Sequence, residues 1–378
     1  MTARFADVLI LGAGPAGAAL ALALRRADKG DVVIIDAPAP RPLHVGEAAA
    51  PGLGALLARL GLDDQLEAHG HRPCHGNRSA WGSETHNISD FMMRAQGPGW
   101  HLDRGAFDAW LLGEAQAAGT ELISPARLEA AEWDGNRWQA RLRHRDQTVS
   151  LNARWIVDAT GRPAAFARRN GAALHRLDRL IALAVLAEPA EGSGFDSYSQ
   201  IEASETGWWY AAQLPCGKTM VSLMTDNDIA KANGLFSVEG FAAAWQSTRD
   251  VSRLAKPDAI APAAFPAGTQ FIDQAIAPGW LALGDALMAF DPLSASGITG
   301  AIEDAIVASA LLVRLLEEPA DKESKSLRHG YAARANAGLS RFISEHRAIY
   351  ATERRWPQSP FWQRRSAAYT ARPASIPS

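Results

Sequence analysis

Residues 8–17 read VLILGAGPAG, four apolar residues followed at once by three glycines in the spacing GxGxxG. The apolar run is typical of a buried parallel strand, and the alanine-rich stretch 16–27 predicts a helix. Gly12 permits a tight turn, Gly14 lets the backbone approach a pyrophosphate, and Gly17 lets the helix pack closely on the strand. The helix N-terminus directs N–H groups and positive dipole character toward phosphate. The stretch therefore predicts half of a dinucleotide-binding unit.

A second apolar run completes this unit. Residues 32–35 read VVII and are followed by Asp36. An acidic residue about 20 residues beyond the glycines can accept hydrogen bonds from ribose hydroxyls. A lone GxGxxG is a weak signal, but strand, turn, helix, strand and acid in this order predict an α/β fold with a Rossmann-type domain.

A stretch near residue 280 indicates whether the bound cofactor is NAD or FAD. Residues 276–283 predict another buried strand, and Gly284-Asp285 follows it directly. An aspartate just past a strand end can bond to a ribityl chain, a group that NAD lacks. The small-residue loop Asp291 to Ile298 then leads into a helix whose N-terminus would direct positive charge at an isoalloxazine ring. We therefore expect FAD.

Two intermediate segments fit the same site. Residues 155–158 predict a strand that runs into a turn at Gly161, close to where a nucleotide would lie. Gly99 to Arg104 leads into a helix, and Arg104 is placed to reach the pyrophosphate or ribityl region. An exposed arginine at a helix start is the alternative interpretation of Arg104.

Composition narrows the class of protein. The 378 residues are 47% hydrophobic, enough for a large core and two interlocked domains. The net charge of -3 argues against nucleic acid or an anionic membrane as partner. The two cysteines, Cys74 and Cys216, lack metal-ligand spacing, so we expect no metal and favour a cytoplasmic location. No apolar run approaches the ~20 residues of a membrane span.

Motif order gives a resemblance over nearly the whole chain. Val45 to Ala48, Gly99 to Arg104, Gly284-Asp285 and Asp291 to Ile298 resemble motifs of flavoprotein monooxygenases related to tryptophan halogenases. More narrowly, RSAWGS at 78–83, GWWY at 207–210 and WPQSPFW at 356–362 resemble flavoproteins that mature lysine and glycine oxidases. Those relatives help to make a tryptophan-derived quinone cofactor within a partner enzyme. The resemblance implies a p-hydroxybenzoate-hydroxylase-like fold with an interleaved β-sheet substrate domain and C-terminal helices.

The expected domains are discontinuous. We assign residues 1–75, 97–172 and 267–323 to the FAD-binding domain, and 324–378 to a C-terminal helical region and tail. The substrate domain takes 76–96 and 173–266. Its expected strands are 180–186, 208–214 and 220–225.

Candidate site residues follow from the motifs and the resemblance. The expected cofactor contacts are Gly12, Gly14, Ala16, Gly17, Asp36, Glu47, Ala48, Arg104, Leu128, Gly161, Asp285, Pro292, Gly297 and Ile298. The candidate acids and bases, with structural roles as the alternative, are His44, Glu47, His101 and Asp291. Residues expected to line an aromatic substrate pocket, with ordinary core packing as the alternative, are Trp81, Trp208, Trp209 and Tyr210.

The expected reaction is hydroxylation of an indole-type ring through a flavin C4a-hydroperoxide, with O2 as co-substrate. Ser294 stands where tryptophan halogenases carry a glutamate, and a matching lysine is missing, since only Lys29 precedes Lys218. The substrate is a small aromatic molecule or a tryptophan of a partner oxidase. No second GxGxxG unit exists, so electrons come from transiently bound NAD(P)H or from a separate flavin reductase. A halogenase and a non-catalytic flavin-binding assembly factor are the alternatives.

Overall fold

The computed structural model describes residues 4–37, 43, 45–62, 65–91, 96–192, 197–257, 260–317 and 321–366. Its first layer is an eight-stranded sheet around the apolar strand β1. The strands of its main path are, in spatial order, β19 (Ile276–Ala277), β20 (Trp280–Ala282), β11 (Gln147–Asp158), β1 (Arg4–Leu11), β2 (Val32–Ile35) and β8 (Glu121–Ile123). From β20 to β8 neighbouring strands are parallel, and β9 (Ala126–Trp133) and β10 (Trp138–His144) extend β11 as an antiparallel arm. This is a Rossmann-type arrangement.

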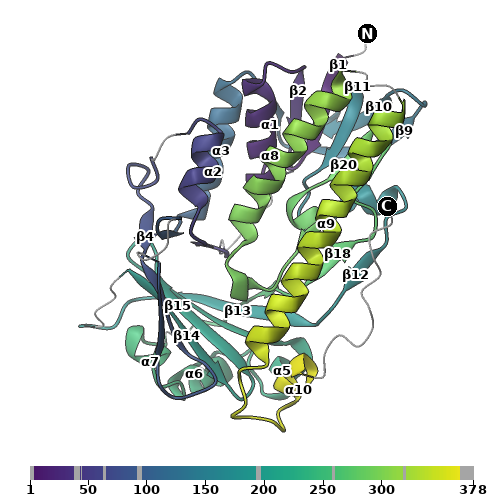
Figure 1. Ribbon diagram of the computed structural model, residues 1–378. Helices are drawn as coiled ribbons and strands as arrows, with labels where there is room; N and C mark the ends of the chain where they lie inside the picture. Colours follow the sequence, from purple (N-terminus) through teal and green to yellow (C-terminus); the bar gives the residue numbers. More distant parts are fainter. Residues whose placement is uncertain are drawn as a thin grey trace.

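Helices cover this parallel sheet because its strands are apolar on both faces. α1 (Pro15–Arg26) lies between α3 (Arg104–Ala117) and α8 (Gly297–Leu316), as Figure 1 shows. Leu20, Leu22 and Leu24 of α1 are fully buried in the shared core. The shorter helices nearby are α2 (Leu53–Arg59) and α4 (Ala165–Arg169).

A seven-stranded sheet forms the second layer, below the start of α8 in Figure 1. Its order is β17 (Ala263–Pro266), β13 (Leu180–Ala187), β16 (Thr219–Asp226), β15 (Gly207–Gln213), β14 (Tyr198–Ser204), β5 (Gly76–Ala80) and β6 (Asn87–Asp90). The outer face is covered by α5 (Asn227–Ala232), α6 (Val238–Gln246) and α7 (Val251–Leu254). The inner face packs with Leu293 of the loop before α8 and with Val45.

Two small sheets join the layers. They consist of β12 (Leu174–Arg176), β18 (Gln270–Ile272) and β21 (Met288–Ala289), and of β3 (Ala48–Ala49), β7 (Gly99–His101) and β4 (Arg72–Cys74). The 3-10 turns η1 (Gly284–Ala286) and η2 (Pro292–Ser294) lie between β20 and α8. The connecting strands thus carry the motifs of both layers toward one place.

The helix α9 (Asp321–Tyr350) runs from the first layer down to the second in Figure 1. Its upper part, with Tyr331, Leu339 and Ile343, packs into the core of the first layer. Its last residue, Tyr350, packs in the core of the second layer with α10 (Pro360–Ser366). Among the described residues, no helix is both long and apolar enough to cross a membrane.

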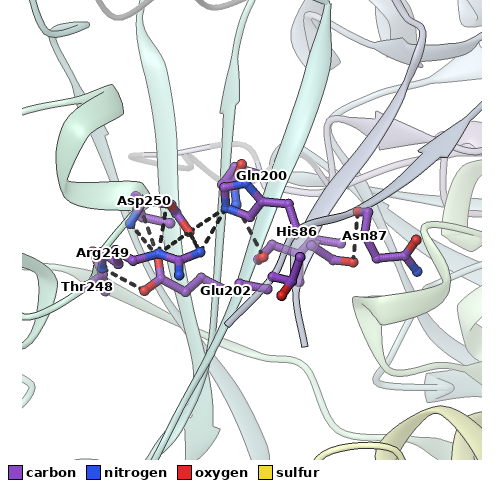
Figure 2. A network of polar contacts seen from close by, with 12 residues as sticks. His86, Asn87, Gln200, Glu202, Thr248, Arg249 and Asp250 are labelled. Carbon is purple, nitrogen blue, oxygen red and sulfur yellow. Dashed lines mark hydrogen bonds and ion pairs between the residues drawn. The ribbon is translucent and has the colours of Figure 1, made fainter. Parts of the chain in front are cut away.

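One edge of the second layer is fixed by a polar network, shown in Figure 2. Glu202 of β14 is buried and accepts hydrogen bonds from the backbone N–H groups of Arg249, Asp250 and Val251, at 2.7, 2.9 and 3.1 Å. Asp250 in turn pairs with His86, which precedes β6, at 2.8 Å. The network therefore ties the β5–β6 hairpin to the start of α7.

Candidate functional site

The glycine turn after β1 is built from three glycines with different surroundings. A Cβ at Gly12, where φ is +111°, would lie 2.4 Å from the Ala159 oxygen, and one at Gly17 would lie 2.0 Å from the Gly12 oxygen. A Cβ at Gly14 meets no described atom within 4 Å. Gly14 is also the N-cap of α1, and no described side chain caps this helix. The first N–H groups of α1, those of Ala16 and Gly17, therefore lack a cap from any described side chain, as an anion site at this helix start requires.

Asp36 lies at this turn as the sequence predicts. Its Oδ1 accepts a hydrogen bond from Ala13 N at 3.1 Å. The carboxylate is partly exposed at the carboxyl end of β2. It can accept further hydrogen bonds there, which suits a ribose.

The second stretch meets the first through Gly284. A Cβ at Gly284 would lie 2.9 Å from the Cβ of Ala16 in α1 and 3.6 Å from that of Ala301 in α8. This glycine therefore lets two helix starts approach each other. α8 begins at Gly297 after Ser296, again without a cap from a described side chain, and a Cβ at Gly297 meets no described atom within 4 Å.

Asp285 lies beside this junction with a side chain that is 44% exposed. Arg162, which the sequence analysis missed, lies 3.9 Å from Asp285 and donates to the backbone oxygens of Gly268 and Phe290. Two uncapped helix starts, the space at Gly14 and acids at both strand ends fit the pyrophosphate, ribose and ribityl groups of FAD.

Arg104 braces the segment that carries Glu47. Its Nη1 donates to the oxygens of Val45 and Gly46 at 3.2 and 3.0 Å, and its Nη2 donates to Asp108 at 3.1 Å. It is therefore a partly buried arginine with several partners, and its contact with a cofactor stays a prediction.

The other expected cofactor residues are spread around this region. Ala48 starts β3 and pairs with His101, while Leu128 lies on β9. Gly161 has a φ of +72° in the turn after β11. The strand end at Asp158 was expected near the nucleotide, but its buried carboxylate accepts hydrogen bonds from Thr160, Phe166 and Ala167 and so fixes this turn. Pro292 and Ile298 flank the loop before α8.

Two of the candidate acids and bases, Glu47 and His101, come together. Glu47 is buried, and this burial raises its pKa against the effects of its backbone, of Arg104 and of the Tyr210 hydroxyl. The Tyr210 hydroxyl lies next to Glu47 and Ser199, and Ser199 Oγ is 2.9 Å from His101 Nε2. Burial and Arg72 lower the pKa of His101 to about 4. At neutral pH His101 is therefore uncharged.

This cluster adjoins the loop before α8. Ala50 N donates to the Ala295 oxygen at 3.1 Å, and Leu102 N donates to the Glu47 oxygen at 2.8 Å. The segment with Glu47 thus lies between the first layer and the inner face of the second. His44 falls outside the described residues.

Asp291 belongs to a different cluster. It is fully buried, and its Oδ2 accepts hydrogen bonds from His346 Nε2 at 2.9 Å and from the Tyr350 hydroxyl at 2.8 Å. Burial acts to raise its pKa, but the hydrogen bond and charge of His346 outweigh this, and the pKa is lowered. Neither His346 nor Tyr350 was expected at the site from the sequence. Their i, i+4 spacing on one helix was the available signal.

The four aromatic candidates divide between the two faces of the second layer. Trp208 and Tyr210 point to the inner face, whereas Trp209 points outward and packs on Phe241, with ring centroids 5.3 Å apart. Alternation along β15 requires this separation. Trp81 packs edge-on to Trp208 at 6.3 Å and to Tyr350 at 5.4 Å. The structure therefore does not bring the four together in one pocket.

Strand register defines what surrounds Tyr210 on the inner face. Across neighbouring strands, Tyr210 pairs with Ser222, and Ser222 with Ala184. In the next row Ala182 pairs with Phe265 of β17. Small side chains thus lie between two partly exposed aromatic rings, those of Tyr210 and Phe265. Phe265 was not expected at the site from the sequence.

Both rings approach the first layer. Phe265 and Tyr210 pack in one cluster with Leu293 of η2 and in another with Val45. A flat aromatic molecule suits such a surface, because aromatic rings prefer stacked or edge-on contacts.

Comparisons with known proteins agree with this geometry. The model of the family described as "FAD binding domain" matches residues 5–337. LodB of Marinomonas mediterranea, named as an FAD-dependent oxidoreductase, is 29% identical in an alignment that covers 96% of this chain and 97% of LodB.

Solved structures show the same fold. The myxobacterial chondrochloren halogenase CndH, a FAD-dependent halogenase, superposes with a TM-score of 0.85 at 20% identity, covering 97% of this chain and 87% of CndH. QhpG, a peptidyl tryptophan dihydroxylase essential for tryptophylquinone cofactor biogenesis, superposes with a TM-score of 0.73 at 24% identity, covering 96% of this chain and 79% of QhpG.

Proposed function

Since the chain belongs to the FAD binding domain family and is an FAD-dependent oxidoreductase, we propose that it hydroxylates an indole-type aromatic ring. The observation that carries this proposal is the inner face of the second layer. There Tyr210 and Phe265 flank Ala182, Ala184 and Ser222, opposite the loop that leads into α8.

Bound FAD, once reduced, supplies the electrons that activate O2 for transfer to the ring. The chain holds the ring between Tyr210 and Phe265 and shields it from water. Glu47, which is buried between the layers and whose pKa this burial raises, is the proposed acid or base of the reaction. Electrons reach the flavin from transiently bound NAD(P)H or from a separate flavin reductase. We also propose a cytoplasmic location for the protein.

Within this function we propose that the ring is a tryptophan side chain of a partner oxidase. QhpG supports this, because it is a peptidyl tryptophan dihydroxylase that shares the fold of this chain. The three motifs that resemble those of such flavoproteins, at 78–83, 207–210 and 356–362, also lie together in the structure. The ring of Trp81 packs on the rings of Trp208 and Trp362, with centroids 6.3 and 5.2 Å apart.

A halogenase is the second candidate, favoured by the fold of CndH. Ser294 argues against it. The Ser294 hydroxyl hydrogen-bonds to the Ser296 hydroxyl at 2.7 Å and donates to the backbone oxygen of Asp291. This serine supplies no carboxylate to the loop. Comparing products formed with and without chloride or bromide separates the two candidates.

The decisive experiment combines the purified flavoprotein, a reductant, O2 and an unprocessed partner oxidase, followed by peptide mass spectrometry. We expect oxygen to be added to one tryptophan, with or without halide. If that tryptophan keeps its mass while a free indole or phenol is oxidised, the substrate is a small molecule. If reoxidation of the flavin yields no product from any aromatic compound, the protein is a non-catalytic flavin-binding factor.

Replacement of Phe265 tests the aromatic surface. Phe265→Ala removes one ring beside the small residues, so we expect KM for the aromatic substrate to rise by about tenfold, equivalent to roughly 1.4 kcal/mol, with FAD binding unchanged. The matched control is Phe236→Ala, because Phe236 is 39% exposed on another surface of the protein. Equal KM values for the two variants would contradict the assignment.

A further inference from the structure

The carboxylate of Asp291 is held by segments that lie far apart in the sequence. Its Oδ1 accepts from Leu293 N at 2.9 Å, within its own loop. Its Oδ2 accepts from His346 and Tyr350 at the end of α9, at 2.9 and 2.8 Å. These donors stabilise the ionised form and occupy the oxygens that a general acid or base would need.

Tyr350 extends the connection to the second layer. Its hydroxyl oxygen accepts a hydrogen bond from Trp208 Nε1 at 2.8 Å while its proton is donated to Asp291. Trp208 lies on β15, two residues before Tyr210, on the same inner face. One buried hydroxyl thus links the loop before α8 to the strand that carries the proposed substrate contact.

Ring stacking strengthens the hold of α9 on this loop. Phe290, directly before Asp291, stacks on Phe342 with ring centroids 4.1 Å apart. The ring centroids of His346 and Tyr350 are 4.4 Å apart. Phe342, His346 and Tyr350 are spaced four residues apart on one face of α9. A long helix is a rigid element, so contacts at one face fix the position of what they touch.

We infer that His346 and Tyr350 are positioning residues, which act through Asp291 to hold the loop 291–298 against the flavin site. Asp291 is then an anchor and not the acid or base of the reaction. This rests on the proposed placement of the flavin beside the start of α8. Its test needs no aromatic substrate, so it can fail or succeed independently of the proposed hydroxylation.

The test compares variants of the full-length holoprotein by the absorption spectrum of bound FAD and by the Kd for FAD. Tyr350→Phe keeps the ring but removes the hydroxyl, and His346→Leu removes the other donor. For each we expect an altered spectrum and a Kd raised by about tenfold, the scale of one lost hydrogen bond to a charge. His346→Gln retains an N–H donor, so it should restore most of the wild-type binding.

The matched control is Tyr198→Phe, which also removes a hydrogen bond from a tyrosine to an aspartate, here to Asp90 at 3.1 Å on the edge of the sheet. It should leave the flavin spectrum and Kd unchanged. The inference is overturned if Tyr350→Phe and His346→Leu bind FAD like the wild type, or if His346→Gln is no better than His346→Leu.

The pH profile of flavin reoxidation tests the role of Asp291 separately. Charged or titratable groups that face it are His346, Tyr350, Arg365, Asp178 and Arg162. An anchor predicts that Asp291→Asn, Tyr350→Phe and His346→Leu change the rate without removing an ionisation from the profile. Loss of one ionisation in Asp291→Asn alone would make Asp291 an acid or base and contradict the inference.

Discussion

At the scale of single residues, buried charge is the most informative feature of the site. Glu47 is 4% exposed between the two layers, and its burial raises its pKa. A buried carboxyl group costs stability when it ionises, so its presence at the proposed flavin face is better explained by function than by folding.

The pH dependence of stability tests this cost. Because the pKa of folded Glu47 lies above its ordinary value of 4.5, its contribution to the free energy of unfolding is fully present below pH 4.5 and is lost as pH rises through the folded pKa. We therefore expect Glu47→Gln to gain stability over the wild type with rising pH, measured by urea unfolding of the FAD-free protein. Glu132→Gln at an exposed position of β9 should show no such trend. A constant difference for Glu47→Gln would contradict the assignment.

Substitutions at two glycines of the turn after β1 should affect FAD binding and protein stability separately. A Cβ at Gly14 meets no described atom within 4 Å, so Gly14→Ala should keep the stability of the FAD-free protein but weaken FAD binding by about tenfold or more. Gly12 has a φ of +111° and a Cβ there would clash with the Ala159 oxygen, so Gly12→Ala should lower the free energy of unfolding by about 2 kcal/mol or more. Fluorescence titration with FAD and urea unfolding measure the two effects. Equal losses of FAD binding and stability in both variants would refute the distinction.

At the scale of elements, alternation and long-range pairing decide where side chains lie. The sequence predicts strands at 180–186, 208–214 and 220–225, and the structure places β13, β15 and β16 there. Whether a strand residue faces the outer core or the inner face depends on which face of the sheet the helices α5, α6 and α7 cover. The local sequence of the strand does not determine this. Trp209 therefore joined Phe241 in the outer core, away from Tyr210.

The start of α7 offers a test at this scale (Figure 2). Glu202→Gln replaces an acceptor of three backbone N–H groups by an amide that also carries donors, so it should lower the free energy of unfolding by about 2 kcal/mol. Glu205→Gln makes the same chemical change at an exposed position and should have little effect. Urea unfolding of both variants measures this difference. Equal stability of both would show that the network contributes little.

The limits of sequence reasoning have the same physical origin. The glycine turn, Asp36 and Gly284-Asp285 were predictable, because each signal lies within one local unit. The partners of Asp291 were not, because His346 and Tyr350 lie more than fifty residues further on. Phe265 was missed because β17 is a short strand, AAFP, with little strand signal. Domain boundaries and cofactor contacts remain predictions.

At the scale of the whole molecule, α9 couples the two layers. It packs by Leu339 and Ile343 in one core and by Tyr350 in the other. Both layers should therefore unfold together, as a single transition in calorimetry.

Breaking α9 in the middle tests the coupling. Gly338→Pro removes a helix hydrogen bond and costs about 3 kcal/mol, so we expect it to split the single transition into two. Gly330→Ala in the same helix should instead raise the melting temperature slightly, since alanine favours helix by up to about 1 kcal/mol over glycine. A single transition in Gly338→Pro would show that the layers are coupled through other contacts.

The meeting of Gly284 with α1 has a consequence for synthesis on the ribosome. The turn at Gly12 emerges early, but α8 and Gly284, which close the same site, emerge more than 270 residues later. The apolar strand β1 also lacks its neighbour β11 (Gln147–Asp158) until that later strand has emerged. Such non-local pairing slows folding and leaves an apolar strand edge exposed in the nascent chain. The flavin can therefore be captured only near the end of translation, and production of the active protein depends on keeping the early strands from aggregating until then.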